Sequence, residues 1–126
     1  MLPAASRMRA RQDFTLAVRR GRRAGDATLV VHYLGAPEAE TRHEPTPARV
    51  GFVVPKAIGN AVVRKRVTRR LRHLVRERLP RVPDGALVVV RALPPSAEAD
   101  YAELETAFDR AWDRVTRPRP VASRTP

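Results

Sequence analysis

The chain has 126 residues, enough for one domain with a single modest hydrophobic core. Its 25 Lys and Arg residues outnumber its 13 Asp and Glu residues, and the formal net charge of +12 favours nucleic acid or an anionic membrane surface as the partner. The absence of Cys excludes disulfides and Cys-based zinc sites, and no apolar run approaches the roughly 20 residues that cross a bilayer, so we expect a soluble cytoplasmic protein.

The first third of the chain predicts a short helix and then a strand. Residues 11–20 predict the helix, because Phe14 and Val18 are spaced for one apolar stripe and Gly21 ends the pattern. Two arginines precede that glycine and two follow it. The run ATLVVHYL, residues 27–34, is rich in β-branched residues and predicts a strand.

The middle of the chain predicts two more strands on either side of a long basic helix. Residues 35–48 contain three Pro and three Glu and predict a mobile connection, which leads into a strand over 49–54. The basic helix covers residues 60–79, with Asn60 as its N-cap. The continuous apolar run over 86–91 is typical of a buried strand.

The C-terminal part predicts one more helix and a tail. Residues 98–116 have apolar side chains on one side of an acidic helix, and residues 117–126 predict a disordered basic tail. The order α-β-β-α-β-α then predicts an α+β protein, an α/β sandwich formed as a single domain by residues 1–116. General rules make its β-α-β crossover right-handed if the two strands are parallel.

The basic helix is the strongest indication of function. Eight of its twenty residues are Lys or Arg against one acid, Glu77, so like charges repel at i, i+4 with no acids interleaved to offset them. A solvated helix usually alternates the sign of its charges, so this pattern favours a polyanion as the partner. Lys56 and Asn60 stand where the helix begins, and its free N–H groups add affinity for phosphate. The basic face carries Lys65, Arg66, Arg69, Arg72, His73 and Arg76, with Arg70 at its border.

The sequence is poor in groups that perform acid–base chemistry. Neither His43 nor His73 has an obvious carboxylate partner in the sequence. The row Glu105, Asp109 and Asp113 fits either a metal-binding row or, more simply, a solvated acidic face. We therefore expect no catalytic side chain and no metal site in the protein.

A second, weaker set of residues is aromatic. Phe14 lies on the first helix, and His32 and Phe52 lie on strands that we expect to be neighbours. These rings, with arginines around them, are suited to stacking on unpaired nucleotides. The alternative, that both phenylalanines belong to the core, is equally consistent with the sequence.

Three segments together resemble one family. GNAVVRKRVTRRLR, residues 59–72, resembles the basic signature of the protein subunit of bacterial ribonuclease P. RARQDFTLAVRRGRR at 9–23 and RVGFVVPK at 49–56 are similar to that family's opening and to one of its strands. The resemblance covers about residues 7–115. A structural RNA-binding protein of the ribosome and a membrane-surface protein are the other functions that the charge allows.

The resemblance implies a fold, partners and an activity. The fold would be a ribosomal-protein-like α/β sandwich with a left-handed β-α-β crossover, contrary to the general rule. The partners would be a catalytic RNA and precursor tRNA, with no membrane and no small-molecule substrate. The RNA, with Mg²⁺ held mainly by the RNA and the substrate, would remove the 5′ leader of the tRNA, and the protein would be a non-catalytic subunit.

The resemblance also implies roles for individual residues. Lys65 replaces an Asn of the signature, and Val18 and His32 stand where the family often has aromatic residues. The residues expected to contact the catalytic RNA are Lys56, Asn60, Arg64, Lys65, Arg66, Arg69 and Arg70. The residues expected to line a cleft for the leader are Phe14, Val18, His32 and Phe52, and the supporting basic residues are Arg9, Arg11 and Arg20.

Overall fold

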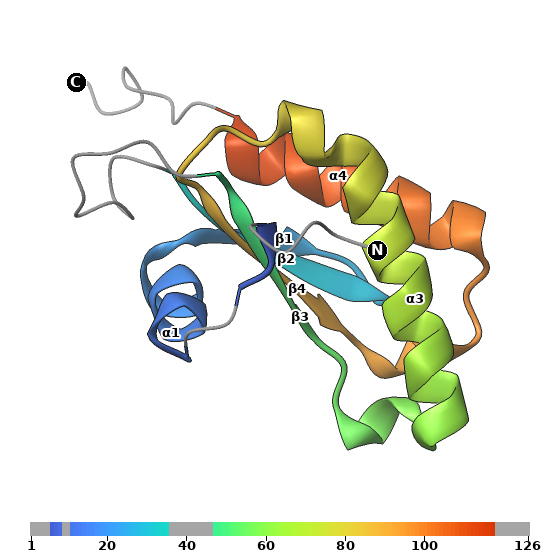
Figure 1. The fold of residues 1–126 in the computed structure, drawn as a ribbon. Helices are drawn as coiled ribbons and strands as arrows, with labels where there is room; N and C mark the ends of the chain where they lie inside the picture. Colours follow the sequence, from blue (N-terminus) through green and yellow to red (C-terminus); the bar gives the residue numbers. More distant parts are fainter. Residues whose placement is uncertain (1–5, 9–10, 36–46, 118–126) are drawn as a thin grey trace, which may run out of the picture.

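The computed structural model describes residues 6–8, 11–35 and 47–117 and shows an α+β fold, as predicted (Figure 1). None of the helices in these ranges is long and apolar enough to cross a membrane. The main elements are α1 (Arg11–Arg20), β1 (Arg22–Gly25), β2 (Leu29–Leu34), β3 (Arg49–Val53), α3 (Ala61–Arg78), β4 (Leu87–Ala92) and α4 (Tyr101–Thr116). The short 3₁₀ helices are η2 (Lys56–Ile58), η3 (Leu79–Arg81) and η4 (Pro94–Ala97).

The strands form one four-stranded sheet in the order β1-β2-β4-β3. β2 is antiparallel to both of its neighbours, whereas β3 runs parallel to β4, with Val50 beside Val88. α3 connects the two parallel strands and so forms the predicted β-α-β crossover. β4 occupies an inner position with neighbours on both edges, which explains why its sequence is a continuous apolar run.

Helices cover both faces of the sheet (Figure 1), with α1 on one face and α3 and α4 together on the other. Side chains of β4 alternate between the two faces: Leu87 and Val89 pack beneath α1, and Val88 and Val90 pack beneath α3 and α4. The core on the α3 and α4 face is the larger of the two. The face that each strand residue occupies therefore follows from its parity along the strand.

β1 is a strand that the sequence did not predict. Its residues, RRAG, have low β propensity, and they pair because Arg23 and Ala24 lie opposite His32 and Val31 of β2. The guanidinium group of Arg22 donates hydrogen bonds to the carbonyl oxygens of two residues at the C-terminal end of α4. These carbonyls have no partner within the helix, so the arginine supplies a tertiary cap.

Several predictions are adjusted at segment ends. α4 begins at Tyr101 rather than at Glu98, because Asp100 caps it in a capping box with Glu103. Ala48, at the end of the predicted mobile connection 35–48, is buried in the larger core. Most of that connection, 36–46, and the tail from 118 onward lie outside the described residues.

Arg78 joins the end of α3 to α4 through carboxylates. Its Nε atom lies 2.6 Å from Asp109 Oδ1, and its Nη2 atom lies 2.9 Å from Glu105 Oε2. The hydrogen bond that Arg78 donates to Asp109, followed by the one that it donates to Glu105, raises the pKa of Arg78 despite the opposing effect of burial. Glu105 and Asp109 remain partly exposed, as a solvated acidic face predicts, and they also bind Arg78, a partner that neither interpretation of the row included. No cluster of three or more potential metal ligands occurs in the described ranges.

We expect Arg78→Ala to lower the free energy of unfolding by about 2 kcal/mol, between the values typical of surface and of buried ion pairs. The physical reason is that two carboxylates lose the cation that holds α4 against α3. Arg76→Ala, an exposed arginine on the same helix, should change it by less than about 0.5 kcal/mol. Urea denaturation of both variants measures the difference, and equal effects would show that the cluster contributes no specific stability.

Candidate nucleic-acid interface

The first turn of α3 is built by the Gly59–Asn60 pair. Asn60 is the N-cap, as predicted, and its Oδ1 atom accepts a hydrogen bond from the backbone N–H of Val63 at 3.0 Å. Gly59 has a φ of 155°, and a Cβ atom there would lie 3.0 Å from the Val63 side chain. Gly59 thus leaves room for the Val63 side chain, and Asn60, which follows it, caps the helix. Lys56, in η2 just before them, is exposed.

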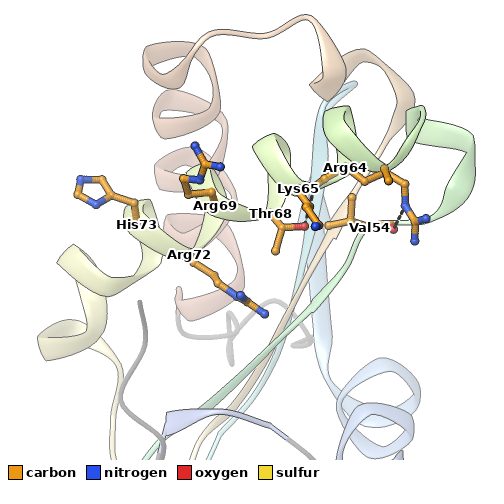
Figure 2. Close-up of a pocket in the computed structure, with 8 residues that line it drawn as sticks. Val54, Arg64, Lys65, Thr68, Arg69, Arg72 and His73 are labelled. Atoms are coloured by element: carbon orange, nitrogen blue, oxygen red, sulfur yellow. Dashed lines mark hydrogen bonds between the residues drawn. The ribbon is translucent and has the colours of Figure 1, made fainter.

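A groove of about 690 Å³ runs along one flank of α3 beside the end of β3. Arg64 bridges the two elements, because its Nε donates to the carbonyl oxygen of Val54 at 3.2 Å (Figure 2). Thr68 donates its hydroxyl to the Arg64 carbonyl at 2.8 Å. The described lining holds four cations and no carboxylate, which gives the groove a positive electrostatic potential. Its lining residues are Val54, Ala61, Arg64, Lys65, Thr68, Arg69, Arg72 and His73.

The opposite flank of α3 faces the segment between β4 and α4. Arg66 donates to the carbonyl oxygen of Ala97 at 3.2 Å, and Arg70 donates to that of Ala99 at 2.8 Å. Arg70 is half-buried, so part of its role is to hold this segment against α3. A guanidinium group has five N–H donors, and the exposed Arg66 therefore keeps donors for an external anion.

Two residues outside the predicted RNA-binding set, Arg72 and His73, line the groove. Helical spacing from Lys65 and Arg69 is the sequence signal for Arg72, since i+3 and i+4 positions share a helix face. The interpretation that His73 lacks a carboxylate partner is wrong. Its Nε2 atom lies 3.5 Å from Glu77 Oε2, one turn along α3.

Two residues of the predicted aromatic set, Phe14 and His32, lie on the opposite face of the sheet, under α1. The ring of Phe14 covers Gly51, where an added Cβ atom would come within 2.4 Å of the Phe14 Cζ atom. Val18, one turn further along α1, is 36% exposed. His32 shares this face because it pairs with Val89, which packs beneath α1. We call Phe14, Val18 and His32 the α1-face set.

Phe52 does not belong to the α1-face set. It pairs with Val90 and packs with Val54 against the larger core beneath α3 and α4. Because neighbouring residues of a strand point to opposite faces, Gly51 beneath Phe14 forces Phe52 to the other side. The prediction that Phe52 lines one surface with Phe14 is therefore wrong. The alternation of side chains along the predicted strand 49–54 would have placed Phe52 and its neighbour Gly51 on opposite faces.

His32 is buried in a cationic environment. Its ring is 3% exposed, and its Nδ1 atom has no hydrogen-bond partner among the described residues. Burial, followed by the positive charges of Arg91 and Arg23, lowers the pKa of His32 below its ordinary value. Little of the imidazole is therefore available for stacking, and the ring is uncharged at neutral pH.

Two of the three supporting basic residues lie on α1. Arg11 begins the helix and Arg20 ends it, and both are exposed. Arg9 lies outside the described residues. Among the described residues, one group of exposed cations thus lies along α3 and another lies along α1, on the other side of the sheet.

Comparison with known proteins gives sequence relatives over nearly the whole chain. The ribonuclease P family model matches residues 2–116. The ribonuclease P protein component of Streptomyces avermitilis is 53% identical over 118 residues, covering 91% of this chain and 95% of that protein. The ribonuclease P protein component of a Nocardioides species is 55% identical over 116 residues, with the same two coverages.

Solved structures show the same fold. The ribonuclease P protein of Staphylococcus aureus has a TM-score of 0.74 at 20% identity, covering 89% of this chain and 96% of that one. The ribonuclease P protein of Thermotoga maritima has a TM-score of 0.67 at 22% identity, covering 90% and 98%. At these identities the likeness establishes the arrangement of the sheet and helices.

Two variants of Asn60 separate capping from anion binding. Asn60→Ala should lower the free energy of unfolding by about 1 kcal/mol, because the Val63 N–H loses its acceptor. Asn60→Asp keeps an acceptor and should preserve stability, but its negative charge beside the groove should weaken RNA binding. Thermal denaturation and RNA titration of both proteins test this. Tight RNA binding by Asn60→Asp would show that the helix start is not part of the interface.

The buried His32 predicts a loss of stability in acid. As the pH falls below the ordinary imidazole pKa of 6.5, the unfolded chain takes up a proton at His32 before the folded chain does. The free energy of unfolding should therefore fall until the lowered pKa of the folded state is reached. His32→Leu should remove this part of the pH dependence, whereas His73→Asn, at an exposed position, should retain it. An unchanged slope in His32→Leu would contradict the prediction.

Proposed function

Because the chain belongs to the ribonuclease P protein family, we propose that it binds the catalytic RNA of ribonuclease P and the 5′ leader of precursor tRNA. Family membership makes the chain a subunit of a ribonuclease that processes tRNA. The observation that carries the finer proposal is the groove along α3, whose described lining holds four cations and no carboxylate. RNA backbones carry the complementary charge.

The α3 groove is assigned to the catalytic RNA. Lys65, Arg69 and Arg72 follow one another along the helix, so they can contact successive phosphates of one strand. Arg64 is held by Val54, which fixes its guanidinium group before any RNA arrives. Preorganised arginines lose less conformational entropy on binding than free ones, and this favours a stable complex.

The α1-face set is assigned to the leader. Phe14 and Val18 supply apolar surface on α1, and the buried His32 supports the sheet beneath them. Arg23 is exposed on the strand beside His32, where it can contact a leader phosphate. Unpaired nucleotides suit such a surface, since their bases are free to lie on apolar side chains while the backbone meets arginines.

The side chains that line the described part of the α3 groove do not fit a Mg²⁺ site. Mg²⁺ requires oxygen ligands, whereas the α3 groove presents guanidinium and ammonium groups. We therefore assign Mg²⁺ and the cleavage step to the RNA and its substrate. The protein contributes by offsetting the repulsion between two polyanions and by positioning the leader, which brings the scissile phosphate to the catalytic RNA.

The decisive experiment is cleavage of a precursor tRNA with a short 5′ leader by a catalytic RNA at low Mg²⁺, with and without the protein. We expect the protein to restore cleavage at the leader junction. Arg69→Gln should flatten the plot of log affinity against log salt by about 0.7 to 0.9, the value of one phosphate contact.

Arg81→Gln is the matched control, because it removes the same charge from an exposed position in η3, outside the groove. Its salt slope should stay close to that of the parent protein. If the protein bound RNA but never stimulated cleavage, a structural RNA-binding role would replace the proposal.

A further inference from the structure

A second hollow, distinct from the α3 groove, lies on α1 and has a volume of about 580 Å³. Its lining comes from two neighbouring rows of the helix, each spaced at i, i+4 and i+8. One row is Arg11, Thr15 and Arg19, and the other is Gln12, Leu16 and Arg20. We call these six residues the α1 hollow.

The α1 hollow faces away from the α1-face set. Around the helix axis, Phe14 and Val18 lie on one side of the Arg11 row, and Leu16 lies on the other side. Ala17 is buried against the sheet. A molecule in the hollow would therefore lie on a different flank of α1 from one that contacts Phe14, and both flanks could be occupied together.

The charge of the α1 hollow is unopposed within the described lining. The one acid of α1, Asp13, turns inward, where its Oδ2 atom lies 2.8 Å from Arg49 Nη1. Arg19 and Arg20 at the C-terminal end of the helix are favoured by its dipole, which explains their position without a ligand. Arg11 stands in the first turn, where the dipole disfavours a cation. Stability of the helix therefore does not account for Arg11.

The remaining groups point to a nucleotide rather than to a bare anion. Arg11 and Arg19 are about 12 Å apart along the helix axis, so they bracket the hollow instead of converging on one phosphate. Leu16 is half-buried against the smaller core and offers an apolar floor. Gln12 and Thr15, both exposed, supply neutral donors and acceptors for the edge of a base or a ribose hydroxyl.

We propose that the α1 hollow is a second RNA site, which takes an unpaired nucleotide with its flanking phosphates on Arg11 and Arg19 and its base or ribose on Leu16. The proposal rests on the RNA-binding function proposed above and adds a contact outside both the α3 groove and the α1-face set. The protein would then hold RNA at α1 and at α3, on opposite faces of its sheet.

Site-directed cross-linking tests the location, because the chain contains no cysteine. Thr15→Cys places one thiol in the hollow, and Thr106→Cys places one at an exposed position of α4 on the other side of the sheet. Each thiol is coupled to a photoactivated aryl azide, and the protein is assembled with catalytic RNA and precursor tRNA. We expect labelling from position 15 at unpaired nucleotides. Equal labelling from position 106, or labelling from position 15 confined to duplex RNA, would overturn the proposal.

Affinity measurements test the contact itself. Arg19→Gln should weaken RNA binding about tenfold, the size of one charge-assisted hydrogen bond, and flatten the salt slope by about 0.7. Arg81→Gln carries the same change of net charge and should leave both values close to those of the parent protein. If Arg19→Gln matched Arg81→Gln while Arg69→Gln weakened binding, the hollow would be excluded and the α3 groove retained. If all three variants behaved alike, the assignment of the α3 groove would fail together with the hollow, whereas the proposed function itself fails only if the parent protein does not stimulate cleavage.

Discussion

The burial of one apolar stripe of α3 determines where the cations of that helix point. The stripe consists of Val67, Leu71, Leu74 and Val75, all nearly inaccessible to solvent. Turning the helix about its axis would expose these side chains, at about 1.5–3 kcal/mol for each large one. The helix is therefore held in one orientation, with one flank of cations beside β3 and the other directed to the carbonyl oxygens before α4. The groove is a consequence of core packing.

Several of the described acids are paired within the fold and so do not offset cations on the surface. Asp13 binds Arg49 beneath α1, and Arg78 takes two carboxylates of α4. Asp100 caps the first turn of α4, where its side chain accepts a hydrogen bond from the backbone N–H of Glu103. The described linings of the α3 groove and of the α1 hollow accordingly contain Lys and Arg side chains and no carboxylate. Fields focused in this way speed the encounter of a protein with a polyanion.

Sequence patterns were informative wherever one element decides its own structure. The spacing of Val67 and Leu71 identified the buried side of the basic helix, and Asn60 identified its first turn. Strand β1 was not predicted, because RRAG has no β-forming pattern of its own and becomes a strand only by pairing with β2. The arginine partner of the acidic row on α4 was missed for a related reason, since Arg78 lies on another helix.

The sequence by itself determined the α+β class, the sign of the surface charge and the presence of a basic helix, because these depend on composition and on local periodicity. The tertiary structure decided which residues share a surface. It set Phe52 on the face opposite Phe14, buried His32 between two arginines, and directed Arg70 to the carbonyl oxygen of Ala99. Such outcomes depend on strand parity and on distances between elements far apart in the chain, and no local pattern encodes those distances.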